Sequence, residues 1–440
     1  MRAFFSRIDH FFFASRSAVS FGVLRIVWAA GTFFTMFWKA PDIVRYFSYE
    51  GMVPPTMEAP FIRSDWRFTL LSTFHDPLSV WILYILLLLS CILMMIGLWP
   101  RLTTILSVLL LFTFHERNPL PLAGGDTVLR MLGFILLISP APALRSLSIH
   151  RLRDQWKHWK EHRTFLPPLQ MPAWPKRLLL WQLIVIYGMS VWSKFLGATW
   201  RNGVAIAVVI QNEHFSRFLQ QTLFRRGLII LSPVLNYLTM AFELSWLLLL
   251  IPRPVLDRLR PTSKGRLRRF LILCGLAFHI GIQFVMAVGS FIWAMSAGLL
   301  GLLEQEDFTA LRRRMNRRHQ QKIAVLYDGH CRFCTRSIFH ILLLDWLHRL
   351  EAIDFHVVAD RHRIAPDLHY KDLNRELHIR FPDGRTCTAF RAFRALAWHL
   401  PLLWPLIPFL YIPGVAWIGK KVYHRISANR RTCTHKNCQY

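Results

Sequence analysis

Long apolar runs, separated by short polar or basic segments, fill the first three hundred residues of this 440-residue chain. A run of about 20 apolar residues is long enough to cross a bilayer as a helix. Eight runs reach or approach that length, at residues 19–38, 78–98, 102–114, 127–138, 178–196, 231–251, 270–288 and 290–303. This pattern predicts a multi-pass α-helical membrane bundle of about eight spans over residues 19–303.

The hydrophobic pattern changes to a shorter alternation after residue 321. In chain order it predicts a buried strand at 322–327, a helix at 331–348, strands at about 352–357 and 375–381, and a helix at about 388–399. A Pro-Asp-Gly turn at 382–384 separates the last strand from the last helix. Residues 322–432 are therefore predicted to form a small α/β domain.

Two segments flank these domains and a third connects them. A cytoplasmic segment (1–18) is predicted before the bundle, a basic cytoplasmic linker (304–321) after it, and a cysteine-containing tail at 433–440. Within the second domain, residues 402–423 are apolar but contain three prolines. We expect helices there that pack on the domain or lie on the inner leaflet, rather than a ninth span.

Composition supports a membrane location and argues against nucleic acid as a partner. Hydrophobic residues make up 53% of the chain, which is too apolar for a soluble protein of this size. The net charge is +29, but the basic residues lie in blocks between apolar runs and form no interleaved binding surface. Membrane topology explains these blocks better than a nucleic-acid partner does.

The basic blocks also predict an orientation. With the N-terminus in the cytoplasm, eight spans place the blocks at 145–177, 253–269 and 312–318 on the inner side, as the positive-inside rule requires. The sequence thus predicts a bacterial-type inner (plasma) membrane protein whose second domain is cytoplasmic. In that reducing compartment a cysteine pair favours catalysis over a stable disulfide.

Cys331 and Cys334 form a CxxC pair where a predicted strand meets a predicted helix. Backbone N–H groups and the dipole at a helix N-terminus stabilise a thiolate at Cys331, the species that attacks disulfides. Cys334 lies one turn further on and can resolve a mixed disulfide. Asp328, at the strand end, is predicted to accept a proton from a thiol or to orient the loop, with helix capping as the structural alternative.

A CxxC pair can also be half of a zinc site. A structural zinc needs two further ligands, for which the sequence offers His330, Cys387, Cys433, His435 and Cys438. We favour redox chemistry over zinc binding, with an inert pair as the third interpretation. The tail cysteines are open to three interpretations of their own: a second redox pair, a metal-binding hook, or an end without structure.

Polar residues gather near the predicted outer ends of the membrane helices, where charge is costly unless it is partnered or functional. A desolvated Lys194 could act as a base, and the alternative is that it extends to the lipid headgroups. Ion-pair networks and interfacial anchoring are the structural interpretations of the other polar and aromatic residues. The candidates for a cofactor pocket are His115, Arg117, Asn118, Asp126, Trp200 and His279.

Residues 19 to about 303 resemble the HTTM domain, the membrane core shared with vitamin K-dependent gamma-carboxylase and its bacterial relatives. The resemblance implies that Lys194 is the base that deprotonates a reduced quinone. It also implies that a quinone (vitamin K-like or ubiquinone) or a lipid binds in the same pocket. The stretches that carry it are Leu24-Arg25-Ile26, Arg117-Asn118-Pro119 to Gly124-Gly125-Asp126, Lys194 to Gly203, and His279 to Trp293.

Residues 322 to about 432 resemble the DCC family of predicted thiol-disulfide oxidoreductases. The resemblance implies a thioredoxin-like core with a redox-active CxxC. The stretches that carry it are Leu326-Tyr327-Asp328-Gly329-His330-Cys331-Arg332-Phe333-Cys334, Phe381-Pro382-Asp383-Gly384, Ala389-Phe390-Arg391-Ala392-Phe393-Arg394-Ala395-Leu396, and Pro413-Gly414.

Three functions follow as hypotheses. The leading one is an integral membrane redox protein that exchanges electrons or disulfides with a partner protein or a small thiol. The second is quinol-dependent gamma-carboxylase-like or epoxidase-like chemistry at Lys194. The third is non-catalytic, a membrane maturation factor with a structural CxxC.

Overall fold

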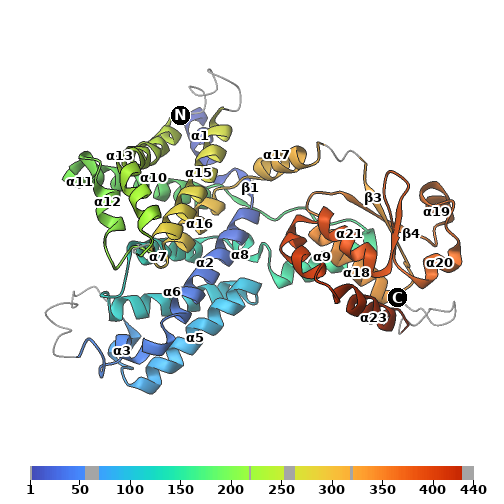
Figure 1. Cartoon of the computed structure of the whole chain (residues 1–440), viewed down its shortest axis with the longest axis horizontal. Coiled ribbons are helices and arrows are strands. Elements are labelled where there is room, and N and C mark those ends of the chain that lie inside the picture. The colour runs from blue at the N-terminus through green and yellow to red at the C-terminus, as the bar shows by residue number, and fades with distance from the viewer. Residues whose placement is uncertain (1, 55–68, 218–219, 252–262, 318–320, 429–440) are drawn as a thin grey trace. The chain divides into compact units, whose positions relative to one another are not determined.

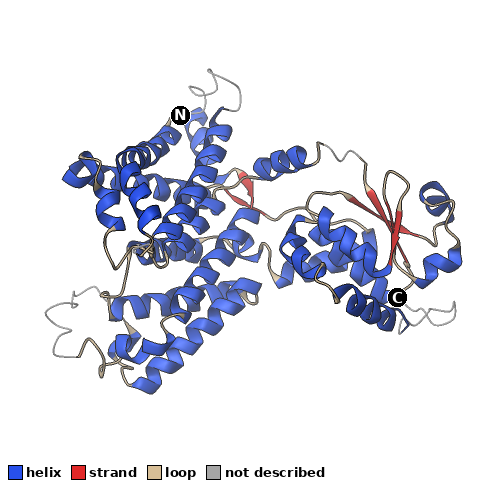
Figure 2. Cartoon of the chain, in the orientation of Figure 1, coloured by secondary structure: helices blue, strands red, loops and turns tan. Residues whose placement is uncertain are grey.

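The computed structural model describes residues 2–54, 69–217, 220–251, 263–317 and 321–428. The tail at 433–440, residues 253–262 of one basic block and Arg318 of another lie outside the described residues. The chain divides after Gln305 into two compact units. Figure 2 shows that the larger sheet belongs to the second unit, whereas the first is helical apart from one short strand pair.

All eight predicted apolar runs form helices in the first unit (Figure 1). These are α2 (Val19–Phe37), α5 (Pro77–Ile96), α6 (Pro100–Arg117), α7 (Gly124–Ile138), α10 (Trp174–Leu196), α13 (Thr222–Ser245), α15 (Ser263–Val285) and α16 (Phe291–Gly301). The ends of α5 show the local cause, because the side chain of Asp76 caps its first turn. Gly97 then ends this helix in the left-handed conformation, at a φ of 69°.

Five of these helices are long and apolar enough to cross a membrane: α2, α5, α10, α13 with its extension to Leu250, and α15. α7 and α16, at about 22 and 16 Å, are shorter than a hydrocarbon core of roughly 30 Å. α6 ends in three polar residues, His115, Glu116 and Arg117. By length and composition, the described residues thus contain five candidate spans, or six if a bent helix pair in the second unit, Ala389–His399 with Pro401–Leu410, counts as one. The count of about eight spans stays a prediction.

The core of the first unit surrounds α2, which packs against α5, α7 and α16. Its apolar face is fully buried through Phe21, Leu24 and Trp28. The indole of Trp28 donates a hydrogen bond to the carbonyl of Leu129 at 2.7 Å, so this large core side chain also has its polar atom satisfied. α2 is thus the helix around which the others assemble.

Arg25 is also buried on α2, and it binds backbone rather than an acid. Its guanidinium donates to the carbonyl of Met94 at 2.6 Å, of Ser146 at 3.3 Å and of Leu147 at 3.0 Å. These carbonyls lie in the last turn of α5 and just after α8 (Ala141–Arg145). One side chain therefore ties together three segments that are distant in sequence.

Shorter elements connect these helices. The predicted segment 1–18 forms a helix and a strand, and the strand β1 pairs antiparallel with β2, with Ser15 opposite Pro172. The shorter elements are α1 (Arg2–Phe13), β1 (Ser15–Ser17), η1 (Ala40–Asp42), α3 (Ile43–Phe47), η2 (Leu70–Ser72), α8, α9 (Ile149–His162), β2 (Gln170–Pro172), α11 (Ala198–Arg201), α12 (Ala205–Ile210) and η3 (Trp246–Leu250).

The second unit is built on a four-stranded mixed sheet in the order β4-β3-β5-β6. β3 (Ile323–Tyr327) lies inside the sheet and every one of its residues is buried. It pairs parallel with β4 (Leu350–Asp354) and antiparallel with β5 (His378–Arg380), which in turn pairs antiparallel with β6 (Thr386–Thr388). The sheet thus joins one strand–helix–strand crossover to one hairpin.

The helices predicted at 331–348 and about 388–399 are present, whereas α19 and α20 were not predicted. The helix predicted at 331–348 is α18 and ends earlier because the Asp345 carboxylate binds the backbone N–H of Arg349 and Leu350, which starts β4. Residues 402–423 form short pieces and a final helix that packs on α21. The helices are α17 (Gln305–Met315), α18 (Arg332–Leu344), α19 (Val358–Ile364), α20 (Tyr370–Arg375), α21 (Ala389–His399), η4 (Pro401–Leu406), α22 (Ile407–Leu410) and α23 (Val415–Ala428).

The predicted linker 304–321 is largely helical and is attached to the sheet domain. α17 occupies most of it, and Asn316 follows directly. The Asn316 amide donates to the carbonyl of Leu347 at 2.7 Å and accepts from the guanidinium of Arg349 at 2.9 Å. The described part of this segment therefore contributes contacts to the second unit.

Replacing Arg25 tests its role as the tie between α2, α5 and the turn after α8. We expect Arg25→Met to lower the free energy of unfolding by roughly 1–3 kcal/mol, because buried carbonyls lose their donor. The measurement is the thermal unfolding midpoint in detergent. The control is Arg153→Met on the exposed face of α9, which should leave the midpoint unchanged. An equal loss in both variants would contradict the role assigned to Arg25.

Candidate functional site

The loop between β3 and α18 carries the cysteine pair. β3 ends at Tyr327, and α18 begins at Arg332 with Cys331 as its N-cap residue. The Cys331 sulfur accepts a hydrogen bond from the backbone N–H of Cys334 at 3.3 Å. Cys331 thus occupies the position at which a helix N-terminus offers free donors and a favourable dipole to an anion.

Asp328 organises this loop. One carboxylate oxygen accepts from the backbone N–H of His330 at 2.9 Å and of Cys331 at 3.1 Å. The same oxygen lies 2.9 Å from Nε2 of His356, a residue just after β4. The carboxylate therefore holds the loop by its backbone and connects it to the neighbouring parallel strand.

Asp354 braces the loop from the end of β4. Its carboxylate accepts from the backbone N–H of Gly329 and of His356, each at 3.1 Å. A Cβ atom on Gly329 would overlap the other oxygen of Asp354, so any larger residue would displace that carboxylate. The glycine is required for close approach of the loop to Asp354.

The environment of Cys331 favours its thiolate. Hydrogen bonds from the Cys334 thiol, and from the backbone N–H groups of Cys334 and Phe333, lower the pKa of Cys331 to about 6. Burial and the charge of Asp328 act in the opposite direction but are outweighed. Cys331 is therefore largely ionised at neutral pH, as a nucleophilic cysteine requires.

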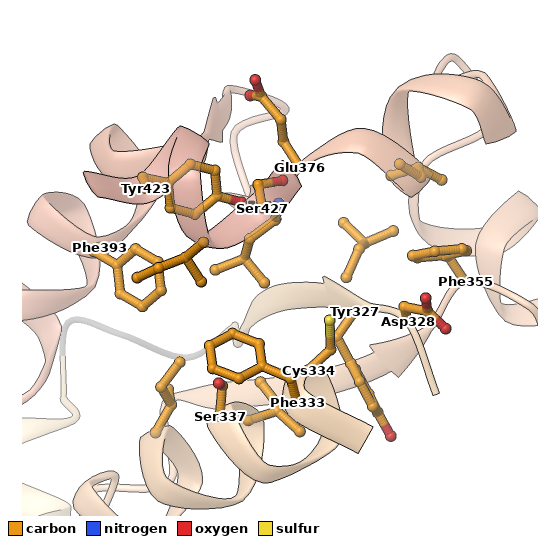
Figure 3. A pocket seen from close by; sticks show the side chains of 16 residues that line it. Tyr327, Asp328, Phe333, Cys334, Ser337, Phe355, Glu376, Phe393, Tyr423 and Ser427 are labelled. Carbon is orange, nitrogen blue, oxygen red and sulfur yellow. Dashed lines mark hydrogen bonds between the residues drawn. The ribbon is translucent and has the colours of Figure 1, made fainter. Parts of the chain in front are cut away.

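Only Cys334 of the pair lines a cavity. Figure 3 shows its sulfur pointing into a space between α18 and the segments that carry Phe393 and Tyr423. Cys331 is only 5% exposed. The cavity has a volume of about 50 Å³ and mostly apolar walls. That volume suits one side chain, because small-molecule sites occupy roughly 300–1,000 Å³.

The last helix closes one side of this cavity. The Tyr423 hydroxyl accepts a hydrogen bond from the backbone N–H of Leu377 at 2.7 Å, and the Ser427 hydroxyl donates to the carbonyl of Arg375 at 2.8 Å. Both bonds fasten α23 to the segment just before β5. The cavity therefore lies between the cysteine helix and the end of α23.

One group of side chains in the described residues has the spacing of metal ligands. The ligand atoms of Asp328, His330 and His356 all lie within 4.8 Å of one another, as a divalent cation would need. The group includes no cysteine. Three of the ligands suggested from sequence for a CxxC zinc site, Cys433, His435 and Cys438, lie outside the described residues.

In the membrane unit, Lys194 joins a buried polar cluster. Its ammonium group is 2.8 Å from both oxygens of Glu243 and 2.6 Å from the hydroxyl of Ser190, and it lies over the Trp200 ring. Glu243 comes from α13, whereas Lys194 and Ser190 come from α10. Lys194 is thus bound within the protein rather than extended to headgroups.

Three of the other predicted membrane-site residues lie near one another. The charge of Asp126 acts on His115, and Asp126 binds Ser290, whose neighbour Phe291 has its ring 5.0 Å from that of His279. His279 is buried on α15, with Nε2 2.8 Å from the hydroxyl of Tyr187 on α10. Asp126 accepts from the hydroxyl of Ser290 at 2.7 Å and caps the start of α7. His115 is buried at the end of α6, and neither of its ring nitrogens has a hydrogen-bond partner in the described part of the chain.

Arg117 and Asn118 hold backbone. The Arg117 guanidinium donates to the carbonyls of Phe47, Ser48 and Val53, and the Asn118 amide donates to the carbonyl of Tyr46. These bonds fix the end of α3 and the segment that follows it. The described hydrogen bonds give Arg117 and Asn118 a structural role. Their predicted contact with a cofactor stays a prediction.

Sequence reasoning missed three residues of the redox site. Asp354 and His356 follow β4, whose carboxyl end lies beside that of β3 because the two strands are parallel. That signal was present in the sequence, but the strand was predicted at 352–357, which included both residues. Tyr423 carries no comparable signal, since only the packing of α23 brings it to the cavity.

The fold and site define a domain with a CxxC at a strand–helix junction, attached to a helical membrane region. Residues 325–436 match the family described as DCC1-like thiol-disulfide oxidoreductase, so the chain carries a domain of that family. The predicted DCC resemblance is thereby confirmed for this part of the chain. No curated protein and no solved structure matches the chain. The match covers none of the membrane region, where the HTTM resemblance stays a prediction.

The thiolate of Cys331 can be tested by its alkylation rate. The rate of iodoacetamide labelling should rise with pH through a midpoint near 6, because only the thiolate reacts. Cys334→Ala removes the thiol donor and should raise that midpoint. Asp328→Asn removes the opposing charge while keeping an oxygen acceptor, and should lower it.

Mass spectrometry of the peptide that contains Cys331 gives the measurement, and labelling of Cys387 in the same digest controls for unfolding. A shift in the same direction for both variants would show that the two groups do not act on the thiolate as described.

Proposed function

We propose that the protein is a membrane-anchored thiol-disulfide oxidoreductase whose reaction takes place at Cys331 and Cys334. The observation that carries the proposal is the Cys331 sulfur at the N-terminus of α18, within hydrogen-bond reach of the Cys334 N–H. The DCC1-like family match supports the same assignment. The substrate is a disulfide or dithiol of a partner protein or a small thiol compound.

The reaction follows from the arrangement of the two sulfurs. The Cys331 thiolate attacks one sulfur of a substrate disulfide, the S–S bond breaks, and the leaving thiolate takes up a proton. The Cys334 thiol loses its proton and attacks the Cys331 sulfur, which releases the second substrate thiol. Two electrons pass to the substrate, and a Cys331–Cys334 disulfide remains.

Asp328 is the proposed proton acceptor for Cys334. Its side chain and that of Cys334 line the same cavity, and its carboxylate is paired with the imidazole of His356. A paired carboxylate and imidazole can take up a proton and hold it between them. The same carboxylate orients the loop through two backbone N–H groups, so both of its predicted roles are compatible with one position.

The sheet supports the predicted thioredoxin-like core. The β3–α18–β4 crossover gives two parallel strands, and β5 and β6 extend the sheet as an antiparallel hairpin on the other side of β3. The cysteine pair starts the crossover helix. A thioredoxin-like oxidoreductase needs this placement, because it puts the nucleophilic cysteine at the carboxyl end of a strand of the sheet.

Serine substitutions separate the two steps of the reaction. Cys331→Ser should lower disulfide-reductase turnover by about a thousandfold or more, since no nucleophile remains. Cys334→Ser should permit attack but not resolution, so a mixed disulfide between Cys331 and the substrate should accumulate. Turnover and intact mass of the purified full-length protein are the measurements.

Cys387→Ser, on β6, is the matched control and should keep wild-type turnover. Equal turnover of Cys331→Ser and wild type would refute the redox assignment.

For the membrane unit we propose a quinone or lipid site around Lys194, in an inner-membrane protein whose redox domain faces the cytoplasm. The support is the Lys194–Glu243–Ser190 cluster beside Trp200, together with the HTTM-like stretches of the sequence. A lysine that binds a carboxylate within the bundle can exchange a proton with a bound quinol. Carboxylase or epoxidase chemistry at this cluster is the finer form of the same proposal.

Quinone binding tests this second proposal. We expect Lys194→Met combined with Glu243→Gln, which removes both charges together, to weaken binding of a short-chain quinone by about tenfold or more. Quenching of tryptophan fluorescence, with Trp200 beside the site, reports the binding. Lys157→Met on exposed α9 is the control. Unchanged affinity in the double variant, or no binding by the wild type, would contradict the site.

A further inference from the structure

A cavity in the first unit lies where α5 turns into α6 and where α8 is followed by α9. Its volume is about 690 Å³, within the range of roughly 300–1,000 Å³ that small-molecule sites occupy. It shares no residue with the Lys194–Glu243–Ser190 cluster. The described residues that line it are Trp99, Pro100, Arg101, Leu102, Ala141, Leu144, Arg145 and His150.

The walls of this cavity combine positive charge with apolar surface. Arg101 and Arg145 contribute two guanidinium groups, and no carboxylate lines the cavity among the residues that the structure describes. Leu102 and Leu144 contribute apolar side chains. A guanidinium matches the geometry of a phosphate group, to which it can donate two parallel hydrogen bonds. The ligand that fits such walls is anionic at one end and apolar at the other.

The described contacts of the two guanidinium groups leave donors for a ligand. Arg101 donates to the carbonyl of Ser139 at 2.9 Å, and Arg145 forms an ion pair with Asp154 at 3.3 Å. A guanidinium has more N–H donors than these contacts use. The side chains of the Arg145–Asp154 pair are about half exposed, and such pairs contribute little to stability. Arg145 can therefore exchange Asp154 for a phosphate at little cost.

Contacts between helices hold the walls of the cavity in place. The Arg25 guanidinium binds carbonyls at the end of α5 and just after α8. The backbone N–H of Trp99 donates to Nε2 of His150 at 3.4 Å, which joins the α5–α6 turn to the start of α9. α6 also packs against α8. The cavity is therefore formed before a ligand arrives, which lowers the entropic cost of binding.

The place of the cavity along α5 indicates its depth in a membrane. α5 is a candidate span of 20 residues, and a helix of that length reaches about 30 Å and matches the hydrocarbon core. The turn after α5 therefore lies at the level of the lipid headgroups, where an exposed Trp99 ring suits the interface. On α6, Leu102 and Leu109 are both about half exposed and lie on one face, so an apolar stripe leads away from the cavity.

We propose that this cavity binds the headgroup phosphate of an anionic phospholipid, with an acyl chain along Leu102 and Leu109. Arg101 and Arg145 hold the phosphate between the start of α6 and the end of α8. Basic pockets between membrane helices are a general kind of lipid-headgroup site. The bound lipid bridges two segments of the first unit and so stabilises it. The proposal is independent of the redox reaction at Cys331.

Binding of short-chain lipids to the delipidated full-length protein in detergent tests the proposal by native mass spectrometry. Dioctanoyl phosphatidylglycerol should bind about tenfold more tightly than dioctanoyl phosphatidylcholine, whose choline places a cation beside the two guanidinium groups. Arg101→Gln/Arg145→Gln should lose this preference.

The matched control is Arg153→Gln/Lys157→Gln, which removes two exposed charges on α9 that do not line the cavity. This variant should keep the wild-type preference. Equal binding of the two lipids by the wild type, or an equal loss of preference in the control, would overturn the proposal.

A soluble anion is the other source of a phosphate group. Glycerol phosphate carries the phosphate without the acyl chains, so it should not displace the bound phosphatidylglycerol at equal concentration. Displacement at an equal concentration would assign the cavity to a soluble phosphate ester and overturn the lipid assignment.

A single substitution separates lipid binding from folding. Arg145→Gln gives up a half-exposed ion pair, so its thermal unfolding midpoint without lipid should match that of the wild type. Phosphatidylglycerol should raise the midpoint most for the wild type, less for Arg145→Lys, which keeps the charge, and least for Arg145→Gln. An equal rise for the wild type and Arg145→Gln would overturn the proposed phosphate contact.

Discussion

The Asp328 carboxylate is the constraint on which the redox domain depends. It binds two backbone N–H groups of the loop and the imidazole of His356, so the chain is fixed between the last residue of β3 and the first of α18. Cys331 can therefore start the helix with its sulfur among free N–H donors. The same negative charge opposes the thiolate, and the donors from Cys334 and Phe333 outweigh it. The Asp328 carboxylate thus orders the loop but destabilises the Cys331 thiolate, and the N–H donors at the helix N-terminus offset this destabilisation.

Much of the fold follows from local pattern. Each apolar run of the membrane region became a helix, because a buried backbone must satisfy its own hydrogen bonds. The number of candidate spans did not follow from the hydrophobic pattern. A helix of 11 or 15 residues next to polar side chains has the same hydrophobic periodicity as a longer helix. In the second unit, β3 and α21 matched their predicted positions within a residue or two. β6 was missed because three residues paired only with β5 carry no alternation of their own.

The residues of the candidate site also differ in whether the local sequence predicts their roles. The cysteine pair and Asp328 were predictable because their roles depend on neighbours in sequence. The contributions of His356 and Tyr423 come from strand pairing and helix packing, which no short motif encodes. Lys194 was predicted as a site residue, yet its partner Glu243 lies 49 positions away on another helix. Arg117 and Asn118 looked like ligand-binding residues in sequence, and their described bonds go to backbone carbonyls at the end of α3 and just after it.

The pairing of β1 with β2 has a topological consequence. A β-ladder can form only between segments on one side of a membrane, so the chain must cross an even number of times between Ser17 and Gln170. Of the described helices in that interval, α2 and α5 are long enough to cross, and α6 and α7 are the undecided ones. If α2 and α5 both cross and no undescribed residue does, an even total requires that α6 and α7 either both traverse the bilayer or both remain on one side of it. Two strands of three residues each thereby couple the insertion of two helices elsewhere in the sequence.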